Sequence, residues 1–247
     1  MAHTAATPAF AGFPPEAFGW FAGLEADNSR AWFAAHRDTY ERAVRGALEA
    51  MLEELAGELG GRVKLFRQHR DVRFSADKAP YKTRTYGVIA DRPDSRGALY
   101  VQLSAGGLFA GSGYHVLAAD QLARMREAIV DDAAGPALEA AVDHAHAAGV
   151  QTFGETLKTA PRGYPRDHPR VHLLRHKALF GGRHLDAGPN GIARVAALAH
   201  ARDTWAACAP LDAWLDEHVG PSAEAPLSRG RRPAARPAPG RPTPGSR

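Results

Sequence analysis

Residues 98–113 read ALYVQLSAGGLFAGSG, which is a strand–turn–strand pattern. From Ala98 to Ala105 large aliphatic residues alternate with polar or aromatic ones, which is the two-residue period of a β-strand with two different faces. The pair Gly106-Gly107 predicts a two-residue turn, after which Leu108–Gly113 returns antiparallel. An antiparallel sheet of at least three or four strands is therefore expected.

Further strands and several helices flank this hairpin. Strands are predicted over Val63–Phe74, Thr85–Ala90 and Lys177–Leu185. Apolar residues three or four positions apart predict helices from Pro14, from Trp32 to Leu59, over Ala119–Asp131, Pro136–Ala148 and Pro169–Arg175, and over Asn190–Val219 with a break at Pro210. Because the strands cluster between groups of helices, the pattern favours an α+β fold, a small antiparallel sheet packed against several helices.

The chain has 247 residues, which is near the upper limit for one hydrophobic core. A single α+β domain is predicted over residues 13–219. Residues 1–12 are expected to be a loose N-terminus. Residues 220–247 are expected to be a disordered tail rich in proline and arginine. Seven prolines and six arginines from Pro221 to Arg247 leave few large apolar groups to offset the entropy of ordering.

Composition and motifs argue against several classes of protein. The single cysteine, Cys208, cannot form an internal disulfide, and it is expected to be inert in an apolar helix. His172 and His176 could share a helix face, but the metalloprotease glutamate is missing and no metal is expected. Since no run of about 18 apolar residues occurs and the first residues lack the order of a secretory signal, a cytoplasmic protein without a membrane partner is expected.

Positive charge concentrates in two segments of the predicted domain. Arg67–Arg84 contains six cations and two acids, and Lys158–Lys177 contains six cations and one acid. Outside the tail the chain has 25 basic and 26 acidic residues, so the rest of the domain is acidic. If the two segments meet in the fold, they form a basic cleft that attracts an anionic ligand.

The stretch from Arg70 to Thr83 is the candidate site, because as a strand and turn it carries charge on both faces. Arginine can hold a carboxylate or phosphate with two hydrogen bonds, and two aspartates cannot neutralise all the nearby cations. The expected ligand is a phosphorylated or carboxylated small molecule, and an enzymatic role stays open. The residues expected to bind it are Arg70, Arg73, Lys78, Lys82, Lys158 and Arg162. Asp71 and Asp77 are expected to orient the cations, and Tyr81 or Tyr164 to supply a hydroxyl. If the protein is an enzyme, Asp77 and Lys78 are the candidate acid–base pair.

The run RDVRFSADKAPYK (residues 70–82) resembles the signature of an uncharacterised bacterial and fungal family, domain of unknown function 2461. The likeness extends over roughly residues 13–219, with a departure at Gln68 and His69. Supporting segments are Asn28, Trp32-Phe33, Tyr40-Glu41, Gly111–Tyr114, Arg126 with Ile129, Leu157-Lys158 and Pro161–Tyr164. The resemblance implies a shared fold and supplies no established activity.

Two other readings of the charges stay open. In one, the protein associates with nucleic acid through both basic segments and the tail, with Tyr81 and Tyr164 stacking on bases. In the other, the arginines and aspartates satisfy one another within a structural domain that has no ligand. Cofactor, substrate and oligomeric state are not assigned by the sequence.

Overall fold

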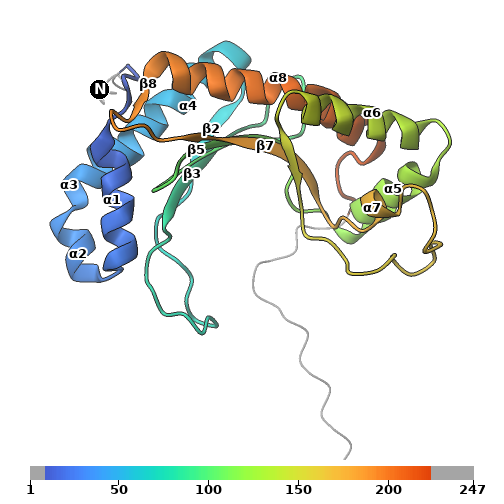
Figure 1. The fold of residues 1–247 in the computed structure, drawn as a ribbon, viewed down its shortest axis with the longest axis horizontal. Helices are drawn as coiled ribbons and strands as arrows, with labels where there is room; N and C mark the ends of the chain where they lie inside the picture. Colours follow the sequence, from blue (N-terminus) through green and yellow to red (C-terminus); the bar gives the residue numbers. More distant parts are fainter. Residues whose placement is uncertain (1–8, 224–247) are drawn as a thin grey trace, which may run out of the picture.

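The computed structural model describes residues 9–223, which form an α+β fold around a six-stranded antiparallel sheet (Figure 1). The sheet order is β2-β3-β4-β5-β7-β6, and β1 and β8 form a separate antiparallel pair. The strands are β1 (Gly12–Phe13), β2 (Arg62–Leu65), β3 (Arg84–Ala90), β4 (Leu99–Ser104), β5 (Gly107–Tyr114), β6 (Gln151–Phe153), β7 (Leu179–Asp186) and β8 (Ile192–Ala193). The helices are α1 (Pro15–Ala26), α2 (Arg30–Ala35), α3 (Arg37–Thr39), the π-helical η1 (Tyr40–Gly46), α4 (Ala47–Leu59), α5 (Ala119–Val130), α6 (Ala134–Ala147), α7 (Val171–Leu174) and α8 (Arg194–His218).

The predicted central hairpin is confirmed as β4 and β5, with its turn one residue earlier than expected. Ser104 pairs with Gly107, so the two turn residues are Ala105 and Gly106. Gly107 belongs to β5 and has φ +133°. A side chain there would meet the backbone of β7, and this close approach explains why the second glycine lies inside the strand.

The two faces of the sheet differ in cover. Alternate residues of β3 and β4, such as Ile89, Val101 and Leu103, are fully buried under α4 and α8, which Figure 1 shows on the same side of the sheet. The residues between them, including Tyr86 and Tyr100, are only partly buried. Covering one face is sufficient for an antiparallel sheet, and it leaves the other face available to a ligand.

The predicted helix from Trp32 to Leu59 is divided in the structure. Ser29 caps its start by accepting a hydrogen bond from the Trp32 backbone N–H at 3.1 Å. Regular helix ends near His36, whose carbonyl accepts from the Trp20 indole at 3.1 Å, and a π-helical turn follows before α4. Most of the predicted apolar stripe is nevertheless buried, including Tyr40 and Val44.

The break predicted at Pro210 is wrong, because α8 runs through it. Proline inside a helix costs about 3 kcal/mol, since it removes one hydrogen bond and crowds the preceding turn. Burial of Trp205, Leu211 and Trp214 on the same helix contributes roughly 1.5–3 kcal/mol for each side chain. Packing on both sides of the proline therefore outweighs the local preference to end the helix.

The two ends of the domain are better ordered than predicted where they are described. Phe10 is buried and Gly12 pairs with Ala193, so residues 9–12 are not loose. At the other end, the carbonyls of Gly220 and Pro221 accept hydrogen bonds from the α5 side chains Gln121 and Arg124. Residues 1–8 and 224–247, which include most of the predicted disordered tail, lie outside the described residues. Among residues 9–223, no helix combines the length and apolar character needed to cross a bilayer.

We predict that Gly182→Ala destabilises the protein by about 2 kcal/mol, because a methyl group at this position of β7 would overlap the Phe109 ring and lie 2.7 Å from the Ala110 carbonyl oxygen. Urea unfolding measures the change. The control is Gly57→Ala in α4, where nothing lies within 4 Å and where alanine should stabilise by about 0.5–1 kcal/mol. Equal stability of Gly182→Ala and wild type would contradict the close packing of Phe109 on β7.

Candidate functional site

Residues 66–83, here called the motif loop, form an irregular excursion between β2 and β3. The strand predicted over Val63–Phe74 ends at Leu65. Two backbone hydrogen bonds close the base of the loop, from Arg70 N–H to the Pro80 carbonyl at 2.8 Å and from Lys82 N–H to the Gln68 carbonyl at 3.0 Å. The charges of residues 70–73 are thus carried on a loop, where water reaches both sides, and not on a strand.

Buried side chains hold the base of the motif loop in place. Gln68 donates to the Lys82 carbonyl and accepts from the Thr85 hydroxyl at 2.7 Å, so the position that departs from the family pattern is a structural one. Asn28 makes two hydrogen bonds of 3.1 Å with the backbone of Tyr81. The Tyr81 ring is 6% exposed and stacks on Phe33 at 4.2 Å. The ring therefore has no accessible face for the predicted base stacking. Tyr81 does line the basic pocket described below, so its predicted role of supplying a hydroxyl to a ligand stays a prediction.

The acids of the motif loop pair with neighbouring arginines. Asp71 accepts from Arg73 at 2.7 Å, and this guanidinium lowers the Asp71 pKa to about 2. Asp77 binds Arg70 and accepts from the Ala79 N–H at 2.9 Å, and both contacts lower its pKa. A carboxylate with a lowered pKa is a weak general base.

The predicted acid–base pair of Asp77 and Lys78 is not assembled in the described chain. The Lys78 ammonium donates to the Val72 carbonyl at 3.0 Å and forms no ion pair within residues 9–223. Both side chains serve to shape the loop.

A basic pocket of about 370 Å³ lies where the motif loop meets β3. Its charged residues are three cations, Arg70, Lys82 and Arg84, and one carboxylate, Asp77. The Lys82 ammonium donates to the Arg67 carbonyl at 2.6 Å. Within residues 9–223 the Arg84 guanidinium has no hydrogen bond and no ion pair. Positive charge in this pocket is therefore only partly compensated.

The second basic segment, Lys158–Lys177, does not join the motif loop. The motif loop follows the edge strand β2, whereas residues 154–178 lie between β6 and β7 at the other edge. The edges are five strand spacings apart, about 24 Å. The loops also leave opposite ends of the sheet, since Gly107 lies at the motif-loop end of β5 and Tyr114 at the other. The predicted cleft between the two basic segments is therefore wrong: the segments lie on two separate surfaces.

Several cations of the second segment have structural partners. Arg170 is buried and donates to the Ile129 carbonyl at 3.0 Å, and Arg175 donates to the Leu157 carbonyl at 2.6 Å. Tyr164 is half-buried, and burial raises the pKa of its hydroxyl. Lys158 and Arg162 are exposed on this separate surface.

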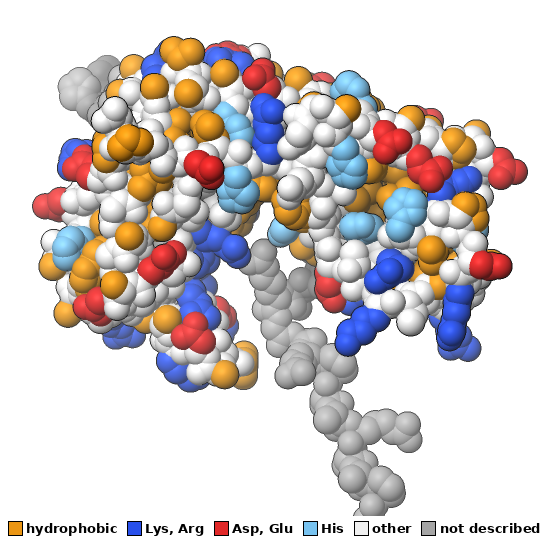
Figure 2. All heavy atoms as spheres, in the orientation of Figure 1, with side chains coloured by type: hydrophobic (Ala, Val, Ile, Leu, Met, Phe, Trp, Pro, Cys, Tyr) orange, Lys and Arg blue, Asp and Glu red, His pale blue; other side chains and the backbone are white. Residues whose placement is uncertain are grey.

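Aromatic rings line the face of the sheet that α4 and α8 leave uncovered. Along it, ring centroids are 4.8 Å apart for Phe66 and Tyr86, 5.6 Å for Tyr86 and Tyr100, and 6.0 Å for Tyr100 and Phe109. The Lys82 ammonium lies 4.6 Å from the centre of the Tyr86 ring. This aromatic face, Phe66, Tyr86, Tyr100, Phe109, Phe153 and Phe180, therefore adjoins the basic pocket through Lys82. Figure 2 shows Lys and Arg side chains gathered on the motif loop beneath the sheet.

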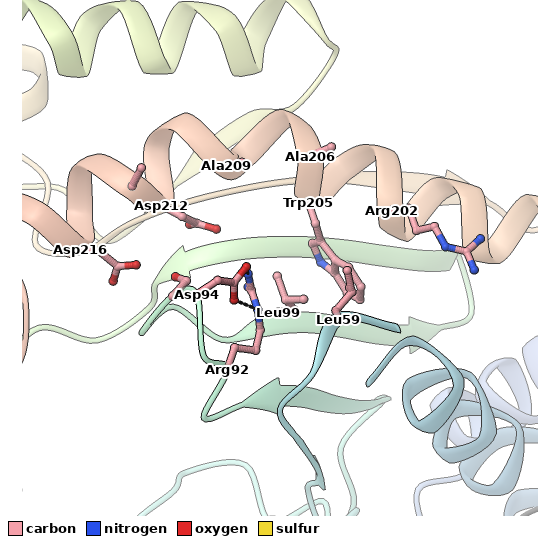
Figure 3. Close-up of a pocket in the computed structure, with 12 residues that line it drawn as sticks. Leu59, Arg92, Asp94, Leu99, Arg202, Trp205, Ala206, Ala209, Asp212 and Asp216 are labelled. Atoms are coloured by element: carbon pink, nitrogen blue, oxygen red, sulfur yellow. Dashed lines mark hydrogen bonds and ion pairs between the residues drawn. The ribbon is translucent and has the colours of Figure 1, made fainter. Parts of the chain in front are cut away.

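A second pocket, here called the α8 pocket, lies on the covered side of the sheet and was not predicted. It occupies about 420 Å³ between α8 and the loop after β3 (Figure 3). Asp212 and Asp216 project into it from α8, and the Ser112 and Tyr114 hydroxyls donate to them, Tyr114 at 2.7 Å. The only sequence signal was an aspartate between buried Leu211 and Trp214 on an apolar helix.

Burial dominates the chemistry of α8 near this pocket. It raises the Asp212 pKa to about 6; Asp216 adds to the rise, whereas the Ser112 hydrogen bond and Arg92 oppose it. Burial also raises the Cys208 pKa to about 12, so this thiol is not a nucleophile at neutral pH.

A family model described as a conserved hypothetical protein, DUF2461, matches residues 16–214. The chain belongs to the DUF2461 family. The range matched by DUF2461 includes the motif loop, the aromatic face and Asp212. No curated protein matches the chain.

We predict that Asp212→Asn changes how stability depends on pH. A folded pKa of about 6 against about 3.9 in the unfolded chain favours folding at low pH, and this contribution is lost as pH rises through 6. The asparagine variant lacks that loss, so its stability relative to wild type should increase by about 2–3 kcal/mol between pH 4 and pH 8. Chemical denaturation at several pH values measures it.

Asp71→Asn is the contrasting variant. Because the folded pKa of Asp71 is lowered, its contribution is present above the unfolded pKa and is lost as pH falls towards 2. Asp71→Asn should therefore lose stability relative to wild type at neutral pH, with the opposite sign of pH dependence. A pH-independent difference between Asp212→Asn and wild type would refute the raised pKa.

Proposed function

We propose that this DUF2461 protein binds an anionic small molecule, phosphorylated or carboxylated, in the basic pocket at the base of the motif loop. One observation carries the proposal: Arg84 is unpaired among residues 9–223, beside a pocket in which cations outnumber carboxylates. Guanidinium and ammonium groups left without carboxylate partners form strong charge-assisted hydrogen bonds with phosphate or carboxylate oxygens.

The neighbours of Arg84 support the same role. Arg70 is fixed by Asp77 and by the Ala79 carbonyl at 3.2 Å, which orients its guanidinium at the pocket wall. Among residues 9–223, the Lys82 ammonium contacts a neutral carbonyl and the Tyr86 ring but no carboxylate, so its charge is available to a ligand. Asp77 therefore acts as a positioning group for Arg70 in this proposal, in place of the acid–base role considered for it.

The aromatic face indicates what the rest of the ligand is. Arg84 and Tyr86 point to the same side of β3, and the Lys82 ammonium lies above the Tyr86 ring. A ligand with its anionic group on Arg84 and Lys82 can place an apolar or planar portion along Tyr86 and Tyr100. The proposed ligand is thus an anion that carries a ring or other flat group.

Binding of single-stranded nucleic acid is a second candidate, and the aromatic face is the observation that favours it. Partly exposed rings beside Lys64, Lys82 and Arg84 resemble the combination of stacking platforms and cations that holds single strands. Tyr81 is not among these rings, because it is buried. Oligonucleotide binding that weakens steeply as salt is added would favour this candidate, provided that the binding persists after deletion of residues 224–247.

We predict that Arg84→Ala and Lys82→Ala each weaken binding of pyrophosphate or phenyl phosphate at least tenfold. The loss of one charge-assisted hydrogen bond of roughly 1.5–3 kcal/mol corresponds to this change. Isothermal titration calorimetry measures the affinities. Phenyl phosphate should bind more tightly than inorganic phosphate if the aromatic face takes part.

Two arginines away from the pocket provide matched controls. Arg162→Ala removes an exposed cation from the second basic segment, and Arg73→Ala removes one that is already paired with Asp71. Neither arginine lines the basic pocket, in contrast to the sequence-based expectation, so both variants should bind the probes as wild type does. If all four variants lose affinity equally, binding reflects overall charge and not the basic pocket.

A further inference from the structure

The α8 pocket contains two buried polar atoms that lack hydrogen-bond partners within residues 9–223. One is the carboxylate oxygen Oδ1 of Asp212, a residue that is only 6% exposed. The other is Nη1 of Arg92, whose side chain is 10% exposed. Buried polar groups are nearly always hydrogen-bonded, because an unmet buried donor or acceptor loses its hydrogen bonds to water without replacement.

The existing contacts of these two side chains fix their direction. The Ser112 hydroxyl binds the other oxygen of Asp212, and Asp94 binds Arg92 through Nε and Nη2 at 3.0 and 2.7 Å. What is left is one acceptor from α8 and one donor from the loop after β3. Figure 3 shows both side chains reaching into the same space beneath α8.

The charges of the pocket favour a positive ligand group. Arg92 is neutralised by Asp94, and Arg202 at the far end is paired with Glu58 at 2.6 Å. Asp216 receives hydrogen bonds from Tyr114 and from the Arg96 backbone but has no cationic partner in the described chain. Within residues 9–223, these two carboxylates one helical turn apart thus form no ion pair of their own.

The remaining wall of the pocket is apolar. Leu59, Leu99 and Trp205 lie on one side, and the alanines at positions 206, 209 and 213 line the helix. The Trp205 indole donates to the Gly111 carbonyl at 3.0 Å, which holds its ring in place. A single water occupies about 30 Å³ of liquid volume, so a bridging water between Arg92 and Asp212 would leave most of the 420 Å³ unfilled.

We propose that the α8 pocket binds a small organic amine that carries a hydrogen-bond acceptor beside the amine and an apolar side group, the chemistry of an amino acid or amino acid amide. Small movements of the two side chains open these buried atoms to the pocket; the protonated amine then donates to Oδ1 of Asp212, the carbonyl oxygen accepts from Nη1 of Arg92, and the side group packs on Trp205. This site is independent of the basic pocket, which lies at the motif loop.

The probe is L-phenylalaninamide, which carries all three features. 3-Phenylpropanamide lacks the amine, and 2-phenylethylamine lacks the carbonyl. Two-dimensional ¹H–¹⁵N NMR titration of the whole chain follows binding through the indole N–H of Trp205. We expect L-phenylalaninamide to bind at least tenfold more tightly than either reduced probe. No shift at Trp205 with any probe, or equal affinity for all three, overturns the proposal.

Variants separate the α8 pocket from other amine-binding surfaces. Asp212→Asn removes the charge with little change of shape, and Ala209→Leu fills the pocket from an exposed position of α8. Each should weaken L-phenylalaninamide binding at least tenfold. Ala196→Leu, also exposed on α8 but outside the pocket, and Arg84→Ala should leave it unchanged. Unchanged binding by Asp212→Asn overturns the proposal, whatever the outcome at the basic pocket.

Discussion

The contact of α8 with one face of the sheet is the interaction on which the other features depend. The helix comes very close to the strands: a methyl group on Gly181 of β7 would lie 2.8 Å from the Cys208 sulfur, and Trp205 of α8 donates to a β5 carbonyl. Apolar burial along this contact keeps the helix continuous through Pro210. The same contact excludes water from Asp212 and so raises its pKa.

Because α8 and α4 cover one face only, the protein presents two different chemical environments. On the covered side, a small pocket combines apolar walls with two carboxylates, Asp212 and Asp216, that form no ion pair with the described residues. On the other side, aromatic rings meet the cations of the motif loop. The two proposals rest on these separate environments, so each can fail independently of the other.

Local patterns predicted most of the helices and strands, though not all of their ends, and they did not predict how the site is assembled. The alternation around Tyr100 predicted β4, and the charge density of residues 70–82 indicated the motif loop. The prediction that Lys158 and Arg162 lie beside that loop was wrong. Periodicity shows which face of a strand or helix a residue occupies, but it does not show the order of the strands in the sheet. Asp212 was missed since an aspartate on a helix is usually exposed, and only the packing of α8 on β5 buries it.

The α+β class, the central hairpin and the charged loop rich in arginine and lysine could be predicted, because they follow from short-range spacing and composition. The resemblance to the DUF2461 family rested on the motif at residues 70–82. Only the tertiary structure decided that the two basic segments lie at opposite edges of the sheet, that Tyr81 belongs to the core, and that α8 passes through Pro210 over a buried carboxylate. These outcomes depend on contacts between residues far apart in the chain, whose energies exceed the local preferences that a sequence pattern records.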